Sequence, residues 1–247
     1  MNERLLVLAV VFTMALGLSL TLAPGVLPFY AIALAVLACA AVPYLLHSHP
    51  GYTFSPLRMV LPAAIALVAP SIAHDLGSGP FRLVVVFGPG ALLYAVIYAE
   101  YLLIRPSAEL PVQAAWLVIT MAGYGAALGL YLLTYEQKER SVISGPLVAA
   151  ASTALALRLL NLDHVLDRKC VWYAGVAGLA MAEALWPLNY WTLGVAAGGL
   201  ALLLVFYVLV GVMRQLLAGE LNRSILLEYG SVSLAGMVIV FAATRLQ

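Results

Sequence analysis

Four charged residues lie within or at the ends of long apolar stretches, where a carboxylate or a guanidinium group is kept from bulk water. They are Glu100, Arg158, Glu183 and Glu228. A charged group at the centre of a membrane helix costs roughly 2.5–3.5 kcal/mol on insertion scales, so such groups usually face the interior of a bundle and have a partner. Two kinds of chemistry follow from this pattern: a structural ion pair, or a path that carries a proton or another ion.

Three of these residues, Glu100, Arg158 and Glu228, are expected at the depth of the inner leaflet of the membrane, and they favour the structural ion pair. Arg158 lies at the end of one apolar stretch, Glu100 at the end of another and Glu228 at the start of a third, so we expect Arg158 to pair with Glu100 or with Glu228. A proton path also needs titratable groups near the middle of the membrane. That depth holds hydroxyl groups instead, namely those of Thr120, Tyr124 and Ser152.

The remaining carboxylate, Glu183, stands in the sequence EALWPLNYW. Here Pro187 is expected to end a helix, and the three aromatic residues around it are typical of the membrane interface, which places Glu183 about one turn below that interface. We expect Glu183 to be shallowly buried. We also expect it to form a hydrogen bond or ion pair through Arg82, Arg140 or the turn at Asn189.

Motifs of enzymes and metal sites are weak in this chain. The pair Asp163-x3-Asp167 suggests a membrane prenyl or lipid transferase, which would hold Mg²⁺ against a diphosphate, but such enzymes have two aspartate-rich loops and this chain has one. His47 and His49 have no cysteine or carboxylate nearby that would complete a metal site. We therefore predict no catalytic residues, no metal site and no cofactor.

The elements that must position these residues are membrane helices. Of the 247 residues, 64% are hydrophobic and 9% are charged, whereas soluble domains have roughly 25% charged residues. Apolar stretches recur along the chain, each near the ~20 residues that cross a bilayer. The net charge of +1 gives no indication of nucleic-acid binding.

Charges and turn residues divide the chain into nine candidate spans, or eight if the third, which contains two prolines, does not cross the membrane. The spans are Leu5–Leu22, Val26–Leu46, Leu57–Ala73, Leu83–Ile104, Val112–Tyr135, Val142–Leu160, Cys170–Trp186, Thr192–Met213 and Ile225–Ala243. The first is interpreted as a membrane helix rather than a signal peptide, because its apolar stretch is longer than ~15 residues. All loops are short. We therefore predict an all-α transmembrane bundle that forms one domain over residues 1–247, with no soluble domain.

The basic residues between the spans predict the orientation of the bundle. One side has Arg4, Arg58, Arg105, Arg168, Lys169, Arg214 and Arg223, and the other has Arg82, Lys138, Arg140 and Arg245. Because Lys and Arg concentrate in cytoplasmic loops, this distribution favours a cytoplasmic N-terminus and a C-terminus outside, in a bacterial inner membrane.

Residues 135–227 resemble a family of bacterial multi-pass membrane proteins known only as a domain of unknown function. The resemblance rests on Glu183, on the sequence PLNYW that follows it, on Gly198-Gly199 and on Phe206-Tyr207. It implies a membrane bundle, and it implies no chemistry.

Together these features favour a non-enzymatic membrane protein that serves as an accessory or scaffold subunit of a larger assembly. Its partners would be the lipid bilayer and other membrane subunits or further copies of the chain. The alternative is a transporter of small solutes or lipids that uses Glu100, Arg158 and Glu183. The transferase hypothesis rests on the Asp163/Asp167 loop alone.

Overall fold

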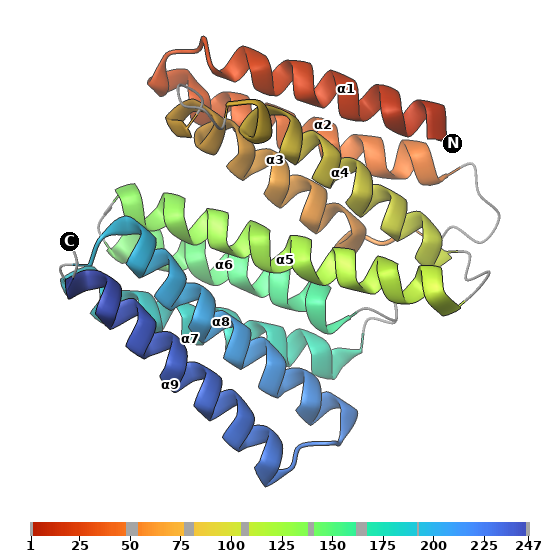
Figure 1. The fold of residues 1–247 in the computed structure, drawn as a ribbon. Coiled ribbons are helices and arrows are strands. Elements are labelled where there is room, and N and C mark those ends of the chain that lie inside the picture. The colour runs from red at the N-terminus through yellow and green to blue at the C-terminus, as the bar shows by residue number, and fades with distance from the viewer. Residues whose placement is uncertain are drawn as a thin grey trace. The chain divides into compact units, whose positions relative to one another are not determined.

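The computed structural model describes residues 2–47, 54–76, 82–104, 109–137, 141–161, 167–191 and 193–245 (Figure 1). Over these ranges the chain forms α-helices and one short 3-10 helix, η1, and no strands. The elements are α1 (Asn2–Ser19), η1 (Pro24–Val26), α2 (Leu27–Leu46), α3 (Leu57–Leu76), α4 (Arg82–Ile104), α5 (Glu109–Gln137), α6 (Ser141–Leu160), α7 (Arg168–Tyr190), α8 (Val195–Ala218) and α9 (Arg223–Arg245). The all-α prediction is therefore confirmed, and each predicted span overlaps a helix.

Among the described residues, six helices are long and apolar enough to cross a membrane: α2, α3, α4, α5, α7 and α8. The third predicted span, Leu57–Ala73, is one of them, and it is the most buried of the six. Pro62 and Pro70 both lie inside this helix. Prolines are tolerated in membrane helices when neighbouring helices supply partners for the backbone groups that they free. Burial of α3 between α2 and α4 fits that requirement.

The chain divides into two compact units, residues 1–126 and 127–247. No break in composition marks the boundary, which falls inside α5. In the first unit α2 packs on α3, while α4 packs on both α1 and α3. Gly90 of α4 lies against Thr13 and the backbone of Ala9 in α1, so closely that a Cβ atom at residue 90 would collide with the Thr13 hydroxyl. Glycine permits this close approach of two helices.

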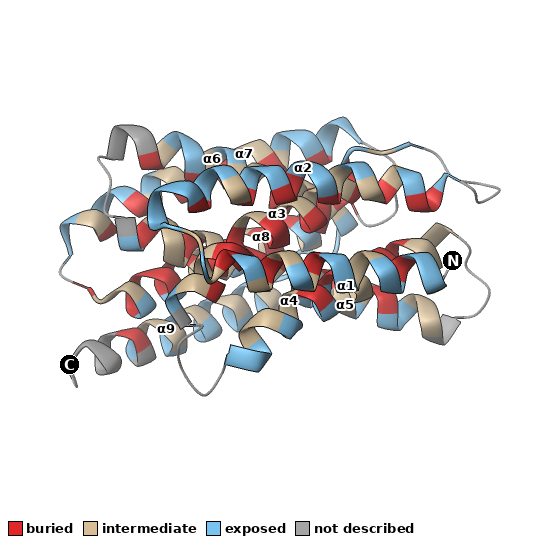
Figure 2. Ribbon diagram, turned by 90° about the horizontal axis from the view of Figure 1, so that it is seen from above, coloured by how far each residue is buried: buried red, intermediate tan, exposed pale blue. Residues whose placement is uncertain are grey.

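The second unit also relies on glycines for close packing. Gly178 of α7 lies against Thr153 and Ala149 of α6, and Gly198 of α8 lies against the ring of Tyr135 in α5. Burial is one-sided on most of these helices, with a buried and an exposed face visible along each (Figure 2). The exposed faces are largely apolar, as expected for helices whose surroundings are lipid.

In each unit, the helix that comes first along the chain touches helices that follow it. In the first, α1 contacts α2, α3 and α4. In the second, α5 contacts the three helices that follow it: Tyr131 shares a hydrogen bond with Ser152 of α6, Tyr135 donates one to Leu188 of α7, and the Tyr131 ring packs on Phe206 of α8. Side chains of α5 therefore reach all three of the helices that follow it.

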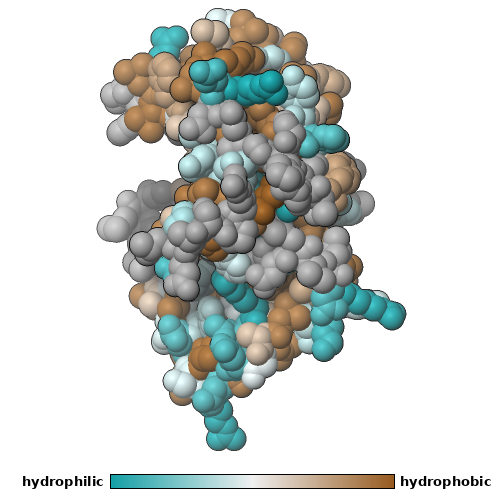
Figure 3. All heavy atoms as spheres, turned by 90° about the vertical axis from the view of Figure 1, so that its right-hand side faces the viewer, coloured by the Kyte–Doolittle hydropathy of each residue, from teal (hydrophilic) through white to brown (hydrophobic). Residues whose placement is uncertain are grey.

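Polar side chains concentrate near the helix ends. Figure 3, which looks at the right-hand ends of the helices in Figure 1, shows hydrophilic groups on that end together with apolar ones. Of the charged residues described below, Arg58 lies in the first turn of α3, Arg158 in the last turn of α6, and Glu100 four residues before the end of α4.

Candidate functional site

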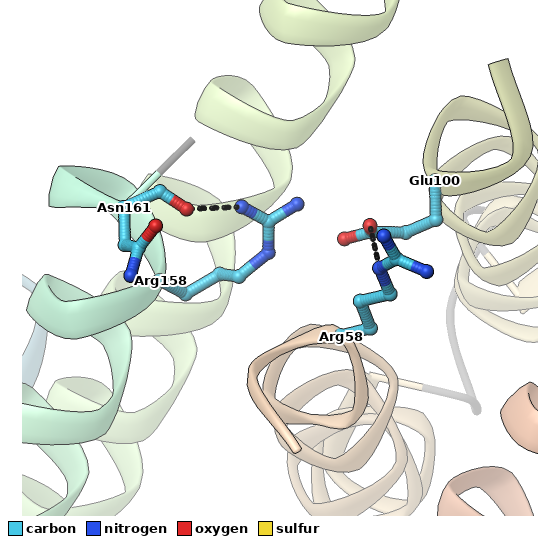
Figure 4. Close-up of polar contacts among 4 residues, drawn as sticks. All are labelled: Arg58, Glu100, Arg158 and Asn161. Carbon is cyan, nitrogen blue, oxygen red and sulfur yellow. Dashed lines mark hydrogen bonds and ion pairs between the residues drawn. The ribbon is translucent and has the colours of Figure 1, made fainter. Parts of the chain in front are cut away.

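The best-formed charged site in the first unit joins α3 to α4. Arg58, the second residue of α3, lies 3.8 Å through Nε from Oε2 of Glu100, near the end of α4 (Figure 4). Their side chains are only 3% and 1% exposed. Because α3 and α4 are consecutive helices that pack together, the start of one lies beside the end of the other. Glu100 therefore forms a buried ion pair with Arg58, a partner that the sequence did not predict.

Arg58 is not among the site residues predicted from the sequence, where it serves only to predict orientation. It lies directly after the first residue of a predicted span, a position at which a charge is typical of a loop. The signal that could have found it is the antiparallel pairing of neighbouring spans, which brings residue 58 to the level of residue 100. The predicted pairing of Glu100 with Arg158 stays a prediction, since those residues belong to different units.

Arg158, in the last turn of α6, is 1% exposed and its Nη1 donates a hydrogen bond of 3.3 Å to the backbone oxygen of Asn161 (Figure 4). A cation at this position complements the negative end of the helix dipole and satisfies a carbonyl group beyond the helix end. Arg158 therefore closes α6. Its predicted place at the end of the sixth span, inside the protein, is confirmed.

One half of the aspartate pair has a structural role. Asp167 precedes α7 as its N-cap and is exposed, and its Oδ1 accepts a hydrogen bond from the backbone N–H of Lys169. Such capping satisfies one of the backbone donors at the start of a helix. Asp163 and Arg140 lie outside the described residues. Within the described residues, no three His, Cys, Asp or Glu side chains come together in a way that could hold a metal ion.

Glu228 does not face the interior of a bundle, and that prediction is wrong. It is exposed on α9, a helix that packs on α8 and has most of its described residues exposed. Arg82, the first residue of α4, is likewise exposed, whereas Asn189 near the end of α7 is half-buried.

The predicted burial of Glu183 is also wrong. The helix continues through Pro187 to Tyr190, so Glu183 lies seven residues, about 10 Å, before its end. Proline removes a hydrogen bond from an established helix but does not always end it. Glu183 is exposed, and within the described part of the chain its carboxylate has no hydrogen bond or ion pair, so the expected contact with Asn189 is not seen.

The end of α7 is instead held from α5. The hydroxyl of Tyr135 lies 2.9 Å from the carbonyl oxygen of Leu188 and 3.3 Å from that of Trp191. Both carbonyl groups lie at the end of α7, where helical carbonyls no longer have a donor four residues later, and that of Leu188 also accepts a hydrogen bond of 3.2 Å from the backbone N–H of Trp191. The end of α7 is therefore anchored to α5 by a buried tyrosine.

Comparison with known proteins gives one match. Residues 6–243 fit the model of a family described as "Protein of unknown function (DUF5656)". No curated protein and no solved structure matches. The resemblance to an uncharacterised family, predicted over residues 135–227, is confirmed and extends over nearly the whole chain. This protein is therefore a member of the DUF5656 family.

Proposed function

We propose that this protein is a non-enzymatic integral membrane protein that serves as an accessory or scaffold subunit of a larger membrane assembly. Its location would be a bacterial inner membrane, with the N-terminus in the cytoplasm and the C-terminus outside. In this role it acts through the outer faces of its helices, on which other membrane proteins pack.

One observation supports the proposal above the others: Glu183 lies on an exposed, otherwise apolar face of α7. The charges that are buried, on Arg58, Glu100 and Arg158, have contacts inside their own units. A carboxylate that faces lipid is expensive. A neighbouring protein that covers this face and supplies a donor removes that cost, so the outward position of Glu183 favours a subunit over a protein that works alone.

The test is recovery of the assembly from native membranes. The tagged full chain is cross-linked in the membrane, extracted in mild detergent and separated by size, and its companions are quantified by mass spectrometry. We expect other membrane proteins at a constant ratio to the chain, which an unrelated tagged membrane protein of equal abundance does not recover. Recovery of the chain alone, at the size of a monomer, would contradict the proposal.

A second candidate, transport of a small solute or lipid, is favoured by the buried Arg58–Glu100 pair. In this role the ion pair opens and closes as part of an ion-coupled path, together with Arg158 and Glu183. In reconstituted vesicles, Glu100→Gln would then abolish a flux that the wild-type chain supports. A wild-type chain that supports no flux of protons, ions or lipid would exclude this candidate.

A further inference from the structure

The exposed face of α7 has the spacing of a coiled-coil seam. Six of its exposed positions alternate between four and three residues apart: Trp172, Val176, Leu179, Glu183, Trp186 and Tyr190. The five uncharged side chains are between 51% and 77% exposed. A repeat of 3.5 residues is the pattern on which a second helix packs along the whole length of the first.

The opposite face of α7 is already occupied. Its buried residues include Ala174, Ala177, Gly178 and Met181, and Gly178 lies against Thr153 of α6. The helix thus has one face of small residues that packs inside its unit and another of large residues that does not. The large residues include Trp186 and Tyr190, whose rings meet edge to face at 6.4 Å. Aromatic residues of this kind often dominate the energy of protein interfaces.

Within this seam, the polar groups at residue 183 are all acceptors. Glu183 lies four residues, about 6 Å, from Leu179 at the middle of the helix. The carboxylate accepts hydrogen bonds. The backbone carbonyl of Glu183 also lacks its usual donor, because the residue four positions later is Pro187, which has no N–H. A partner group that packs against Glu183 must therefore donate hydrogen bonds, and a positively charged group also matches the charge of the carboxylate.

A second copy of the chain fits this requirement poorly. Association of two parallel copies about a two-fold axis brings the same patch together, which would set Glu183 opposite Glu183 at equal depth. Neither carboxylate could donate to the other without taking up a proton. A different helix, with arginine or lysine at that level, satisfies the acceptors, and arginine has the larger set of donors.

We infer that the exposed α7 seam binds a transmembrane helix of another protein, with a basic residue of that helix against Glu183. This inference rests on the proposed function and specifies which face and which partner chemistry carry it. A single polar residue in an apolar seam also sets register, as polar residues do in coiled coils. Glu183 thus selects the partner helix and the apolar residues supply the contact area.

A synthetic helix provides the direct test. The probe is a labelled peptide of leucine and alanine, about 22 residues long, with one arginine about 6 Å from its centre. Its binding to the labelled full chain is measured by energy transfer in phosphatidylcholine vesicles. We expect the arginine peptide to bind about tenfold more tightly than the same peptide with leucine. Equal binding of the two peptides would overturn the inference.

Variants of the chain show which residue causes the preference for the arginine peptide. Glu183→Leu is expected to abolish the preference for arginine, and Glu183→Gln to reduce it. Glu228→Leu, which changes another exposed glutamate on α9, is expected to leave it intact. If Glu228→Leu removes the preference and Glu183→Leu does not, the assignment to α7 is wrong. Repeating the measurement with phosphatidylethanolamine tests a lipid amine as the donor, and loss of the preference there would overturn the choice of a protein partner.

Photo-cross-linking in native membranes separates this inference from the proposed function. A photoreactive residue replaces Leu179 in the seam or, as a control, Leu234 on the exposed face of α9. We expect cross-links to one membrane partner from position 179 and few from 234. A stable assembly that cross-links from 234 alone would refute the seam and leave the subunit proposal standing. A chain that is always recovered alone, yet prefers the arginine peptide, would contradict the subunit proposal and leave the binding seam on α7 standing.

Discussion

At the scale of single residues, the charged groups fall into two kinds. Arg58, Glu100 and Arg158 are buried and have partners in their own units, while Glu183 and Glu228 are exposed. Because the residues of the first kind are buried and have partners, removal of one partner should lower the stability of the chain. Because the second kind is exposed, its substitution should have little effect on the stability of the isolated chain. Any role of these residues then lies in contacts with other molecules.

The buried pair predicts a strongly coupled pair of substitutions. Replacing one partner with leucine leaves a buried charge uncompensated, so Arg58→Leu and Glu100→Leu should each lower the free energy of unfolding by ~3–5 kcal/mol. The double variant should recover most of that loss. Denaturant titration of the purified chain in detergent measures these differences, with Arg82→Leu as an exposed control. Additive losses in the double variant would show that the two side chains do not depend on each other.

For Glu183 the structure reverses the expectation drawn from the sequence. A buried, pinned carboxylate would make Glu183→Leu clearly destabilising. An exposed one without a partner inside the chain should tolerate leucine, and the free energy of unfolding should stay within ±0.5 kcal/mol. Thermal unfolding of the isolated chain in detergent tests this. If the free energy of unfolding falls by ~1–2 kcal/mol, the scale of interhelical polar contacts, Glu183 does have a polar contact with a neighbouring helix, as the sequence predicted.

At the scale of elements, glycines decide how closely the helices approach. Gly178 and Gly175 lie three residues apart on α7 and have opposite surroundings. A Cβ atom at 178 would collide with Thr153 and the backbone oxygen of Ala149, whereas a Cβ atom at 175 meets nothing within 4 Å. The two positions are therefore a matched pair for testing the packing of α6 on α7.

Gly178→Ala should destabilise the chain by ~1–3 kcal/mol, because α6 and α7 must separate to admit the methyl group. Gly175→Ala should stabilise it by up to ~1 kcal/mol, because alanine is the better helix former and no contact opposes it. Thermal unfolding of both variants in one detergent gives the comparison. Equal effects at the two positions would mean that α6 and α7 do not meet at Gly178.

At the scale of the whole molecule, the order of the helices predicts which loops share a side of the membrane. A single helix, α6, lies between the end of α5 and the start of α7. If α6 crosses the membrane, Glu136 and Lys169 lie on opposite sides, with Glu136 outside. Both side chains are exposed and suited to labelling.

Cysteine labelling of intact cells tests this topology after Cys39 and Cys170 have been replaced by alanine or serine. A membrane-impermeant reagent should label Glu136→Cys in intact cells, and Lys169→Cys only after the membrane is opened. Labelling of both positions from the same side would show that α6 does not cross. The predicted orientation would then be wrong.

The sequence by itself determined the class of fold and the places of the helices. A chain with 64% hydrophobic residues and 9% charged residues can bury its backbone polar groups in lipid only as helices or closed barrels, and its long apolar stretches predict helices. It also placed Arg158 at a helix end and pointed to the uncharacterised family. Each of these inferences depends on local composition or spacing, which a single sequence contains.

Only the tertiary structure decided which face of each helix is covered. Glu100 and Glu183 both stand in apolar helices after alanine, yet one is buried against Arg58 and the other is exposed. In membrane helices both the buried and the lipid-facing sides are apolar, so the polar-apolar periodicity that reveals the inner face of a soluble helix is weak here. Pairing of α3 with α4, closure of α7 by Tyr135, and the outward position of Glu183 depend on contacts between distant residues.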